Sequence, residues 1–366
     1  MPGNTGSSSW TTTYAPSIEV KLMDESKQPL KDIPHEDVIN LEIEEELEKP
    51  AVFKISLNDA VDLSTQKPRW STDTGIQPGN MVKVSIGYAS DTEKKSFSFL
   101  GRIRSISKPK EDENGNTLEL GGYDLSYDMV KKDTTGIIYN DKKYSDIVTE
   151  LAGNNQLNTD KIETSPLTYE NVIRSPGESD FAFLKRMSGE IGFEAFVQEE
   201  SLYFRKPKDT LQGQVTLNKN VGIIKFHPRI NNAACVSEVT VNAWDVKTKE
   251  MISETATLED IKSGVGIKEF TTASEKFTDI KITLGNKVLR SVEEAKNIAV
   301  AELKRRNENF INANMECVGN PKLRPGMTVN IGKEEESFSG VYYIKQATHK
   351  LGKKGYFTTM ELRGCL

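Results

Sequence analysis

The chain has 366 residues, 36% of them hydrophobic and 28% charged, which is typical of a globular protein of two to four domains. Its formal net charge of −6 argues against a dedicated nucleic-acid binder, which usually carries a basic domain or stripe. The sequence contains no run of about 18 apolar residues. We therefore expect no transmembrane helix and no membrane anchor.

Residues 1–17 are rich in Ser, Thr and Gly and lack the basic start and apolar run of a secretory signal peptide. We expect a flexible N-terminal arm. From 18 to 124, short segments alternate apolar and polar residues, which is the pattern of half-buried strands. Asn114-Gly115 predicts a hairpin turn, because both residues tolerate positive φ. These antiparallel strands predict a first, tube-like β-barrel domain over 18–124. The predicted strands are 17–23, 38–43, 52–57, 82–86, 97–100 and 102–106.

Residues 125–210 predict a small α+β domain. A short helix is expected over 144–151, with Ser145 as its N-cap and Gly153 as its stop. A polar and Gly-containing linker, 207–214, ends this domain.

A second helix in this domain is expected over 179–191. Acidic residues crowd its first turn, where the helix dipole favours them, and Gly192 ends it. Its predicted apolar face consists of Phe181, Leu184, Met187 with Ser188, and Ile191. The segments 193–197 and 201–205 then predict a hairpin.

A second β-barrel domain is predicted over 211–366. It would be built from about 221–250 and 312–366, with 251–311 inserted and containing a helix over 291–310. In its strongest strand, Val239, Val241 and Ala243 share one face. The inserted helix would begin with a capping box of Ser291 and Glu294 and bury Val292, Ala295, Ile298, Ala299 and Leu303.

The most informative pattern is a repeat that relates the two predicted barrels. Residues 77–122 resemble 324–364, and Pro78-Gly79 matches Pro325-Gly326 in a turn whose role we interpret as structural. Further matches pair Val82 and Val84 with Val329 and Ile331, Gly101 with Gly340, and 118–120 with 360–362. The spacing from the turn to the matched glycine is 22 residues in one copy and 14 in the other, which predicts a longer loop near 88–95. Two related units in one chain allow three chains to form a ring of six units.

Candidates for metal or cofactor chemistry are few. The histidines His35, His227 and His349 are isolated from one another and from the cysteines. The three cysteines, Cys235, Cys317 and Cys365, form no CxxC pair and fit unpaired thiols in a reducing compartment. No zinc motif, phosphate-binding loop or GxSxG nucleophile motif is present. We expect no metal, no cofactor and no catalytic residue.

For two sites the sequence allows more than one interpretation. Glu178 and Asp180, with Glu190 and Glu194 nearby, resemble a glycosidase acid/base pair. The favoured interpretation is structural, because acidic residues in a first helical turn are stabilised by exposed N–H groups.

Trp244-Asp245 ends a predicted strand. A core Trp followed by an Asp turn is the favoured interpretation, and a surface anchor at a subunit contact is the alternative. The acidic run 42–48 is interpreted as a solvated strand edge or loop, with a subunit interface or channel as the alternative.

Three motifs in order resemble the phage late-control D proteins and the N-terminal part of VgrG spike proteins. The segment from Glu178 to Phe193, with Ser179, Asp180, Phe181, Leu184 and Gly192, is similar to the family signature ESDFxFLxRLxxxxGF. The stretch 239–249 resembles V-x-G-W-D-x-x-T-K, with Ala243 where glycine is usual. The ending from Leu323 through Pro325, Gly326 and Gly340 to His349 resembles the closing barrel of the family. The similarity runs from about 18 to 363.

The resemblance implies an α+β, mainly β protein with two related antiparallel β-barrel domains and a small α+β domain, assembled as a ring-forming trimer. It implies a structural baseplate hub that adapts a six-fold inner tube to a three-fold spike. The implied partners are two further copies of the chain, the inner tube protein, other baseplate proteins and a spike, which we expect to be a separate chain. Nucleic acid or protein cargo would only pass through the channel.

We therefore expect a non-enzymatic component of a contractile phage tail or a phage-tail-like injection system. It would assemble in the bacterial cytoplasm and end in the baseplate of a virion or injection particle. The resemblance covers phages, tailocins, and extracellular and type VI injection systems alike. The alternatives are a cell-wall hydrolase associated with a tail tip and a tail-tube subunit.

Overall fold

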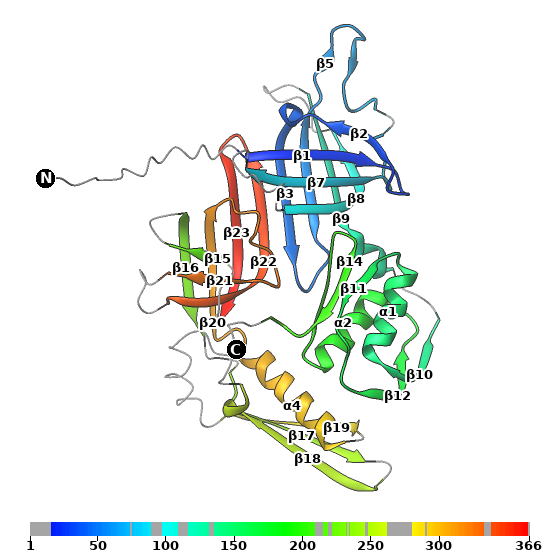
Figure 1. Cartoon of the computed structure of the whole chain (residues 1–366), viewed down its shortest axis with the longest axis vertical. Helices are drawn as coiled ribbons and strands as arrows, with labels where there is room; N and C mark the ends of the chain where they lie inside the picture. Colours follow the sequence, from blue (N-terminus) through cyan, green and yellow to red (C-terminus); the bar gives the residue numbers. More distant parts are fainter. Residues whose placement is uncertain are drawn as a thin grey trace, which may run out of the picture.

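The computed structural model is mainly β and is organised around one large, largely antiparallel sheet (Figure 1). It describes residues 16–73, 75–88, 97–108, 116–131, 135–208, 215–218, 222–231, 233, 235–245, 248–261, 280–289, 291–332 and 338–364. The predicted hairpin turn at Asn114-Gly115, the predicted long loop near 88–95 except for its first residue, and residues 1–15 of the predicted arm lie outside these ranges. The last two residues of that arm already belong to the first strand.

The N-terminal part of the sheet, called here the N-terminal strand set, follows the predicted alternation closely. Its strands are β1 (Pro16–Met23), β2 (Pro29–Ile33), β3 (Val38–Glu46), β4 (Val52–Asn58), β7 (Met81–Tyr88), β8 (Phe97–Ser107) and β9 (Thr117–Asp124). They lie in the order β3-β4-β9-β8-β7-β1-β2. Alternate residues such as Val20, Leu22, Ile55 and Val84 are buried, because successive side chains of a strand point to opposite faces. A short turn η1 (His35–Asp37) and a hairpin of β5 (Val61–Asp62) and β6 (Lys67–Pro68) extend from this set.

The C-terminal part of the sheet, the C-terminal strand set, has the order β16-β20-β23-β22, with β21 on β22 and β15 on β21. Its strands are β15 (Val215–Leu217), β16 (Ile223–Ile230), β20 (Ile311–Val318), β21 (Thr328–Ile331), β22 (Gly340–Gly352) and β23 (Gly355–Gly364). The two sets have the same strand order. In chain order, β1, β3, β4, β7, β8 and β9 correspond to β15, β16, β20, β21, β22 and β23. One pairing differs, because β1 is antiparallel to β7 whereas β15 is parallel to β21.

A lobe between the two sets contains two helices and five strands. The elements of this intervening lobe are η2 (Leu125–Val130), β10 (Ile137–Lys143), α1 (Tyr144–Asn154), β11 (Asn158–Ile162), β12 (Thr168–Arg174), α2 (Asp180–Glu190), β13 (Glu194–Gln198) and β14 (Ser201–Arg205). The hairpin β13–β14 is close to its predicted position. The predicted N-cap of α1 is wrong: Ser145 lies inside the helix, and the Asp146 carboxylate accepts from the N–H of Lys143, the actual N-cap residue.

A third unit, the appended sheet, corrects the predicted extent of the second barrel. It consists of β17 (Glu238–Asp245), β18 (Glu250–Thr257) and β19 (Lys281–Leu289), with the turn η3 (Leu258–Asp260), and is covered by α4 (Val292–Asn307). The sequence assigned 238–245 to the barrel, but among the described strands β17 pairs with β18 and β19 and not with the large sheet. An alternating pattern shows that a strand is half-buried but not which sheet it joins. The inserted unit therefore begins directly after β16 and ends directly before β20.

Helix α4 covers the appended sheet with the face expected from its spacing, with one exception. Ser291 caps it by accepting from the N–H of Glu294 at 3.0 Å, and Ala295, Ala299 and Leu303 are buried. Val292 was predicted to be buried but is 56% exposed.

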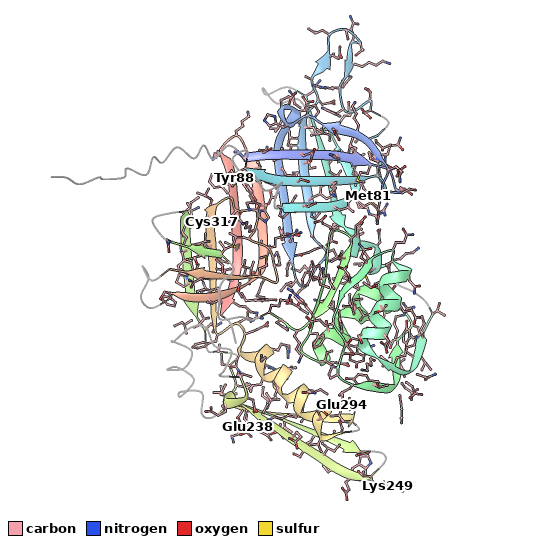
Figure 2. The ribbon with its side chains drawn as sticks, viewed as in Figure 1. Met81, Tyr88, Glu238, Lys249, Glu294 and Cys317 are labelled. Carbon is pink, nitrogen blue, oxygen red and sulfur yellow. The ribbon has the colours of Figure 1, made fainter. Side chains whose placement is uncertain are left out.

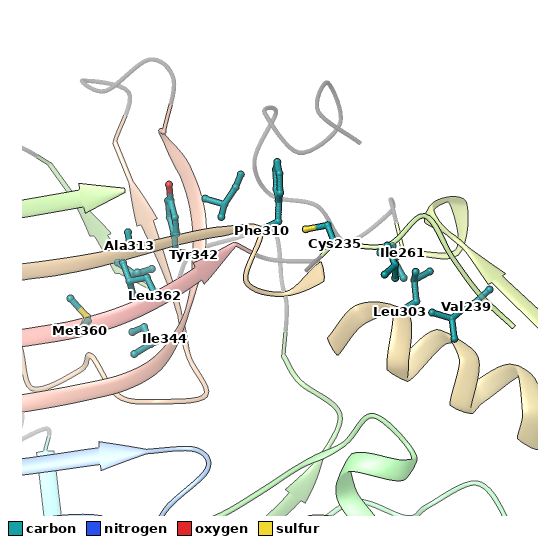
Figure 3. Packing of buried hydrophobic residues seen from close by; sticks show 14 of the residues in the cluster. Cys235, Val239, Ile261, Leu303, Phe310, Ala313, Tyr342, Ile344, Met360 and Leu362 are labelled. Carbon is teal, nitrogen blue, oxygen red and sulfur yellow. The ribbon is translucent and has the colours of Figure 1, made fainter. Parts of the chain in front are cut away.

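One continuous apolar cluster joins the appended sheet to the C-terminal strand set. Figure 3 shows it running from Met360 and Tyr342 through Phe310 and Cys235 to Leu303. Between the two parts of this cluster, the buried Asn307 side-chain amide donates to the Val236 carbonyl at 3.0 Å and accepts from the Val236 N–H at 3.2 Å. The Asn231 N–H also donates to the Phe310 carbonyl at 2.8 Å. The two ends of the insertion are thus tied together.

Candidate functional site

The Pro-Gly turns of the repeat make the same backbone contacts in both strand sets. The N–H of Gly79 donates to the Ile103 carbonyl at 2.9 Å, and the N–H of Gly326 donates to the Ile344 carbonyl at 3.0 Å. Each isoleucine N–H returns a bond to the residue after the glycine, at 2.8 and 2.9 Å. Both glycines have positive φ, +103° and +83°, as this turn requires. The structure therefore supports the matching of Pro78-Gly79 with Pro325-Gly326.

Of the further matches, Val82 and Val84 keep their counterparts Val329 and Ile331, whereas the matches of Gly101 and of 118–120 are displaced by two residues. Val82 lies opposite Gly101, whereas its counterpart Val329 lies opposite Tyr342, so Gly340 is not the equivalent of Gly101. Gly101 is instead a site of close packing, where an added Cβ would lie 2.7 Å from the Phe53 ring. The spacing difference between the copies is accordingly 22 against 16 residues.

The same displacement occurs in the last strand of each set. Ile106 lies opposite Leu120, and its counterpart Ala347 lies opposite Met360, so 118–120 correspond to 358–360. A displacement of two keeps every side chain on its face of the sheet, so hydrophobic alternation does not detect it.

The two strand sets are joined edge to edge within the chain. The second half of β22 pairs with β3 in antiparallel register, from Gln346 opposite Glu46 to Leu351 opposite Leu41 (Figure 1). The acidic run 42–48 was interpreted as a solvated edge or loop. That interpretation is wrong for β3, which is paired on both sides, with β4 and with β22. Its carboxylates instead form ion pairs and hydrogen bonds across the junction.

A buried ion pair lies at the centre of this junction. The Arg324 guanidinium contacts the Glu45 carboxylate through two nitrogens, its Nε at 3.0 Å, and donates to the Ser98 carbonyl at 3.0 Å. The two side chains are only 12% and 6% exposed. The guanidinium also lies 4.7 Å from the Phe97 ring centroid. Burial acts to lower the pKa of Arg324, but Glu45 opposes this through its charge and its hydrogen bonds. The net pKa of Arg324 is raised, so the arginine stays charged.

His349 fills the space beside this pair. It is fully buried, with Nδ1 2.7 Å from the Tyr356 hydroxyl and Nε2 3.0 Å from the Leu323 carbonyl. Burial and the charge of Arg324 lower the pKa of His349 to about 3, although the contact with the Leu323 carbonyl acts to raise it. The neutral ring packs 4.4 Å from Phe97 and acts as a structural element of the junction.

A second polar junction connects the intervening lobe to the C-terminal strand set. The buried Arg205 donates to Glu194 at 2.8 Å and to the Gly326 carbonyl at 2.8 Å. The Tyr343 hydroxyl donates to the other oxygen of Glu194. Burial raises the pKa of Glu194 despite Tyr343 and Arg205, which act to lower it. In the N-terminal strand set the equivalent carbonyl, that of Gly79, accepts instead from Arg102 at 2.8 Å.

The motif helix α2 begins and packs as the sequence predicts. Ser179 is its N-cap and accepts from the Ala182 N–H at 3.2 Å. Leu184 is fully buried and Phe181 is half-buried, but Phe183, which was not predicted, is also fully buried. Lys185 extends from the helix to the N-terminal strand set, where it donates to the Leu47 carbonyl at 2.9 Å.

The end of α2 contacts the appended sheet. Gly192 has φ +68°, and an added Cβ would lie 3.2 Å from Ala301 of α4. Phe193 is buried against Phe204 at a ring distance of 5.1 Å. Helix α2 therefore connects its own lobe to the N-terminal strand set and to α4.

The candidate acid/base carboxylates are each held by an arginine. Arg186 contacts both oxygens of Glu178, at 2.9 and 3.0 Å, and this lowers the pKa of Glu178, whereas a general acid needs a raised pKa. Asp180 accepts from the buried Arg174 and from Asn155. The geometry favours the structural interpretation of both residues.

Trp244 and Asp245 have different environments. Trp244 is 49% exposed and lies opposite the exposed Met251. The predicted core position is wrong, because Val241 and Ala243 occupy the face of β17 that packs on α4. Asp245 is buried and accepts from the Thr248 N–H at 3.2 Å, as a turn residue does.

Over the described ranges, no group of three His, Cys, Asp or Glu side chains is placed to hold a metal ion. Within the same ranges, no helix is long and apolar enough to cross a bilayer. A hollow of about 330 Å³ lies where β7, β14 and Arg324 meet. It is lined by Lys83, Glu199, Glu200, Tyr203 and Arg324 among others.

The residues that connect the parts of the molecule were mostly missed by sequence reasoning. Arg324, Glu45 and Arg205 are far apart in sequence, and single charged residues give no periodic signal. One signal was available: Arg324 directly precedes the Pro-Gly turn, whereas Gln77 occupies the equivalent position in the first copy. A charged residue that is present in only one copy indicates a contact that the other copy does not make.

Comparison with solved structures shows the fold. The chain matches the tail protein from Neisseria meningitidis MC58 at 14% identity and TM-score 0.65, over 96% of both chains. It matches the 43 kDa tail protein of prophage MuSo2 from Shewanella oneidensis at 14% identity and TM-score 0.67, over 95% of this chain and 98% of the other. It also matches the E. coli c3393 protein at 13% identity and TM-score 0.56, over 89% and 73% of the two chains. That protein is described as a component of the type VI secretion system, with structural similarity to T4 bacteriophage tail proteins gp27 and gp5.

No curated protein matches the sequence. The family model described as the Alg8 N-terminal domain matches residues 27–353, which is most of the chain. This family differs in name from the late-control D and VgrG proteins that the motifs resemble, while the solved structures agree with that resemblance at the level of the fold. The chain therefore belongs to the Alg8 N-terminal domain family.

Proposed function

We propose that this protein is a structural hub of a contractile phage tail or a related injection system. The observation that carries the proposal is the pair of strand sets with one strand order, joined edge to edge by β22 and β3. The fold is shared with tail proteins and with a type VI secretion component, which supports a location in a tail or injection particle.

In this proposal, each strand set is one β-barrel and three chains close into a ring of six barrels. The two sets have equivalent strands, so the ring presents six similar surfaces to a six-fold inner tube. The appended sheet is inserted in the second set only, so it repeats three times around the ring and gives the other side a three-fold character. A separate spike chain would bind there, and cargo would pass through the channel.

The role is structural rather than enzymatic. The carboxylates of the motif helix are paired with arginines, and their contacts position α2 between the other parts of the chain. The chain would assemble in the bacterial cytoplasm and then form part of the baseplate with the inner tube protein and other baseplate proteins.

The proposal is tested by the native mass of the purified chain over a range of concentrations. A closed trimer is expected. A hexamer or a continuously growing filament would indicate a tail-tube subunit instead. A wall-digestion assay separates the remaining alternative: activity that is lost on Glu178→Gln would identify a hydrolase.

A further inference from the structure

One edge of the sheet is open in the C-terminal strand set but covered in the N-terminal strand set. In the part of the chain that the structure describes, β16 pairs with β20 alone, whereas its counterpart β3 pairs with both β4 and β22. The two strands correspond residue by residue, because each has a bulge at the same place, before Asn40 and before Lys225. Leu41 and Ile43 of β3 are fully buried, whereas their counterparts Phe226 and Pro228 are only half-buried.

A second edge shows the reverse: it is covered in the C-terminal strand set and open in the N-terminal strand set. Residues 346–351 of β22 are covered by β3, and Ala347 and Thr348 are buried there. The equivalent end of β8, residues 105–107, pairs with β9 on one side and with no described strand on the other. Its Ile106 is half-buried and its Ser107 is exposed. Among the described strands, each chain therefore has one open edge of each type.

We propose that β16 of one chain pairs with the end of β8 in a second copy of the chain, in the register that β3 and β22 use within one chain. This deepens the proposed function and rests on it, since the pairing is the contact that would close three chains into a ring. The contact is head-to-tail, and such contacts form closed rings when the rotation closes. The inferred partners are Asn231 with Ser105, Ile230 with Ile106, Arg229 with Ser107 and Pro228 with Lys108.

The side chains at this edge differ from those of the covered junction in a coordinated way. Within the chain, Glu45 and Arg324 form the buried ion pair. The residues at the equivalent positions are Ile230 and Gln77, so both charges are absent together. A buried charge without its partner is strongly destabilising, so losing both is the change that a second buried junction would tolerate. Ile230 is 45% exposed in the single chain, and pairing with Ile106 would cover it.

Pro228 is also consistent with an edge strand that pairs with one specific partner strand. The Asn231 N–H points to β20, because it donates to the Phe310 carbonyl, so by alternation the backbone groups of Ile230 and Pro228 point outward. Proline has no N–H to donate, and it is tolerated at an edge strand for that reason. It weakens pairing with arbitrary strands while the side chains select the correct partner.

Charge reversal at the junction gives the first test. Ile230→Glu places one carboxylate in the inferred contact, and the native mass is expected to fall from trimer to monomer. Adding Gln77→Arg rebuilds the Glu45–Arg324 pair between chains, and the trimer is expected to return. Ile224→Glu is the matched control, because Ile224 is 47% exposed on the same strand but lies beyond the inferred partners. A trimer that survives Ile230→Glu, or that the double variant does not restore, overturns the pairing.

Disulfide trapping in the full-length chain gives the register. Ser107→Cys with Arg229→Cys places two thiols at exposed positions that would face each other across a non-hydrogen-bonded pair, about 4.5 Å apart at Cα. Oxidation is expected to give linked dimers and trimers but no larger species. Ser107→Cys with His227→Cys, two residues out of register, is expected to give little cross-linked product. The single variants show how much cross-linking comes from the native cysteines. A trimer without the Ser107–Arg229 disulfide contradicts only this junction, whereas a chain that is monomeric at every concentration contradicts the ring as well.

Discussion

The Pro-Gly turns of the two strand sets have the same backbone and different neighbours. In the N-terminal strand set the Gly79 carbonyl accepts from Arg102 of the next strand, while in the C-terminal strand set the Gly326 carbonyl accepts from Arg205 of the intervening lobe. The residue before the turn is Gln77 in one set and the buried Arg324 in the other. Backbone hydrogen bonds thus define the repeated unit, and a few charged side chains decide what each copy is attached to.

The largest effect is expected at the buried ion pair. Glu45→Ala leaves Arg324 buried without its partner and should lower the free energy of unfolding by about 3–5 kcal/mol. Glu42→Ala on the same strand removes an exposed pair with Lys350 and should cost about 0–1 kcal/mol. Chemical denaturation measures both. Equal losses in the two variants would contradict the assignment of the junction to Arg324.

A smaller difference is expected between the two arginines at the turns. Arg205→Ala removes a buried ion pair with Glu194 as well as the contact with Gly326, so a loss of about 3 kcal/mol is expected. Arg102→Ala removes a contact with Gly79 and a more exposed pair with Asp128, for a loss of about 1–2 kcal/mol. Thermal and denaturant unfolding should rank them in this order. The reverse order would show that the lobe does not depend on the turn.

Acidification should weaken the junction through His349. Its pKa is lowered to about 3 in the folded chain, against about 6.5 when unfolded, so the unfolded state binds more protons between these values. Stability contributed by neutral His349 is complete above pH 6.5 and is lost as the pH falls towards 3, by about 1.4 kcal/mol per pH unit. Wild type and His349→Gln should be compared at each pH, since burial raises the pKa of Asp124 to about 7 and acts with the opposite sign in both proteins. A constant difference between the two proteins would rule out this role.

The smallest expected effect is at the turn glycines. Alanine at either position is strained by the positive φ and should cost about 1–2 kcal/mol. Gly326→Ala should cost more than Gly79→Ala, because its methyl group would meet the buried Arg205 at 2.8 Å. At Gly79 it would meet the end of the flexible Glu25 side chain. Unfolding curves measured in parallel would show whether the second copy is the more constrained one.

Local patterns predicted the elements well and their long-range partners poorly. Helix α2, its Ser179 cap and the hairpin after it follow from capping and spacing, which depend on residues within a few positions. Strand β17 was recognised but given the wrong sheet, and Trp244 the wrong environment, because alternation does not identify the layer that covers a strand. The Arg324–Glu45 pair joins positions far apart in sequence, and no local rule connects them.

The insertion between β16 and β20 has a consequence for how the chain folds. The turn from β3 to β4 spans residues 47–51, whereas the equivalent connection spans 231–310. Closing a loop about sixteen times longer costs roughly 2.5 kcal/mol more in chain entropy. The Asn307 clamp on Val236 removes most of that cost once the appended sheet has formed, since it holds the two ends together. We therefore expect the appended sheet to fold first and to act as the nucleus on which β16 and β20 meet, so that a nascent chain completes its second copy late.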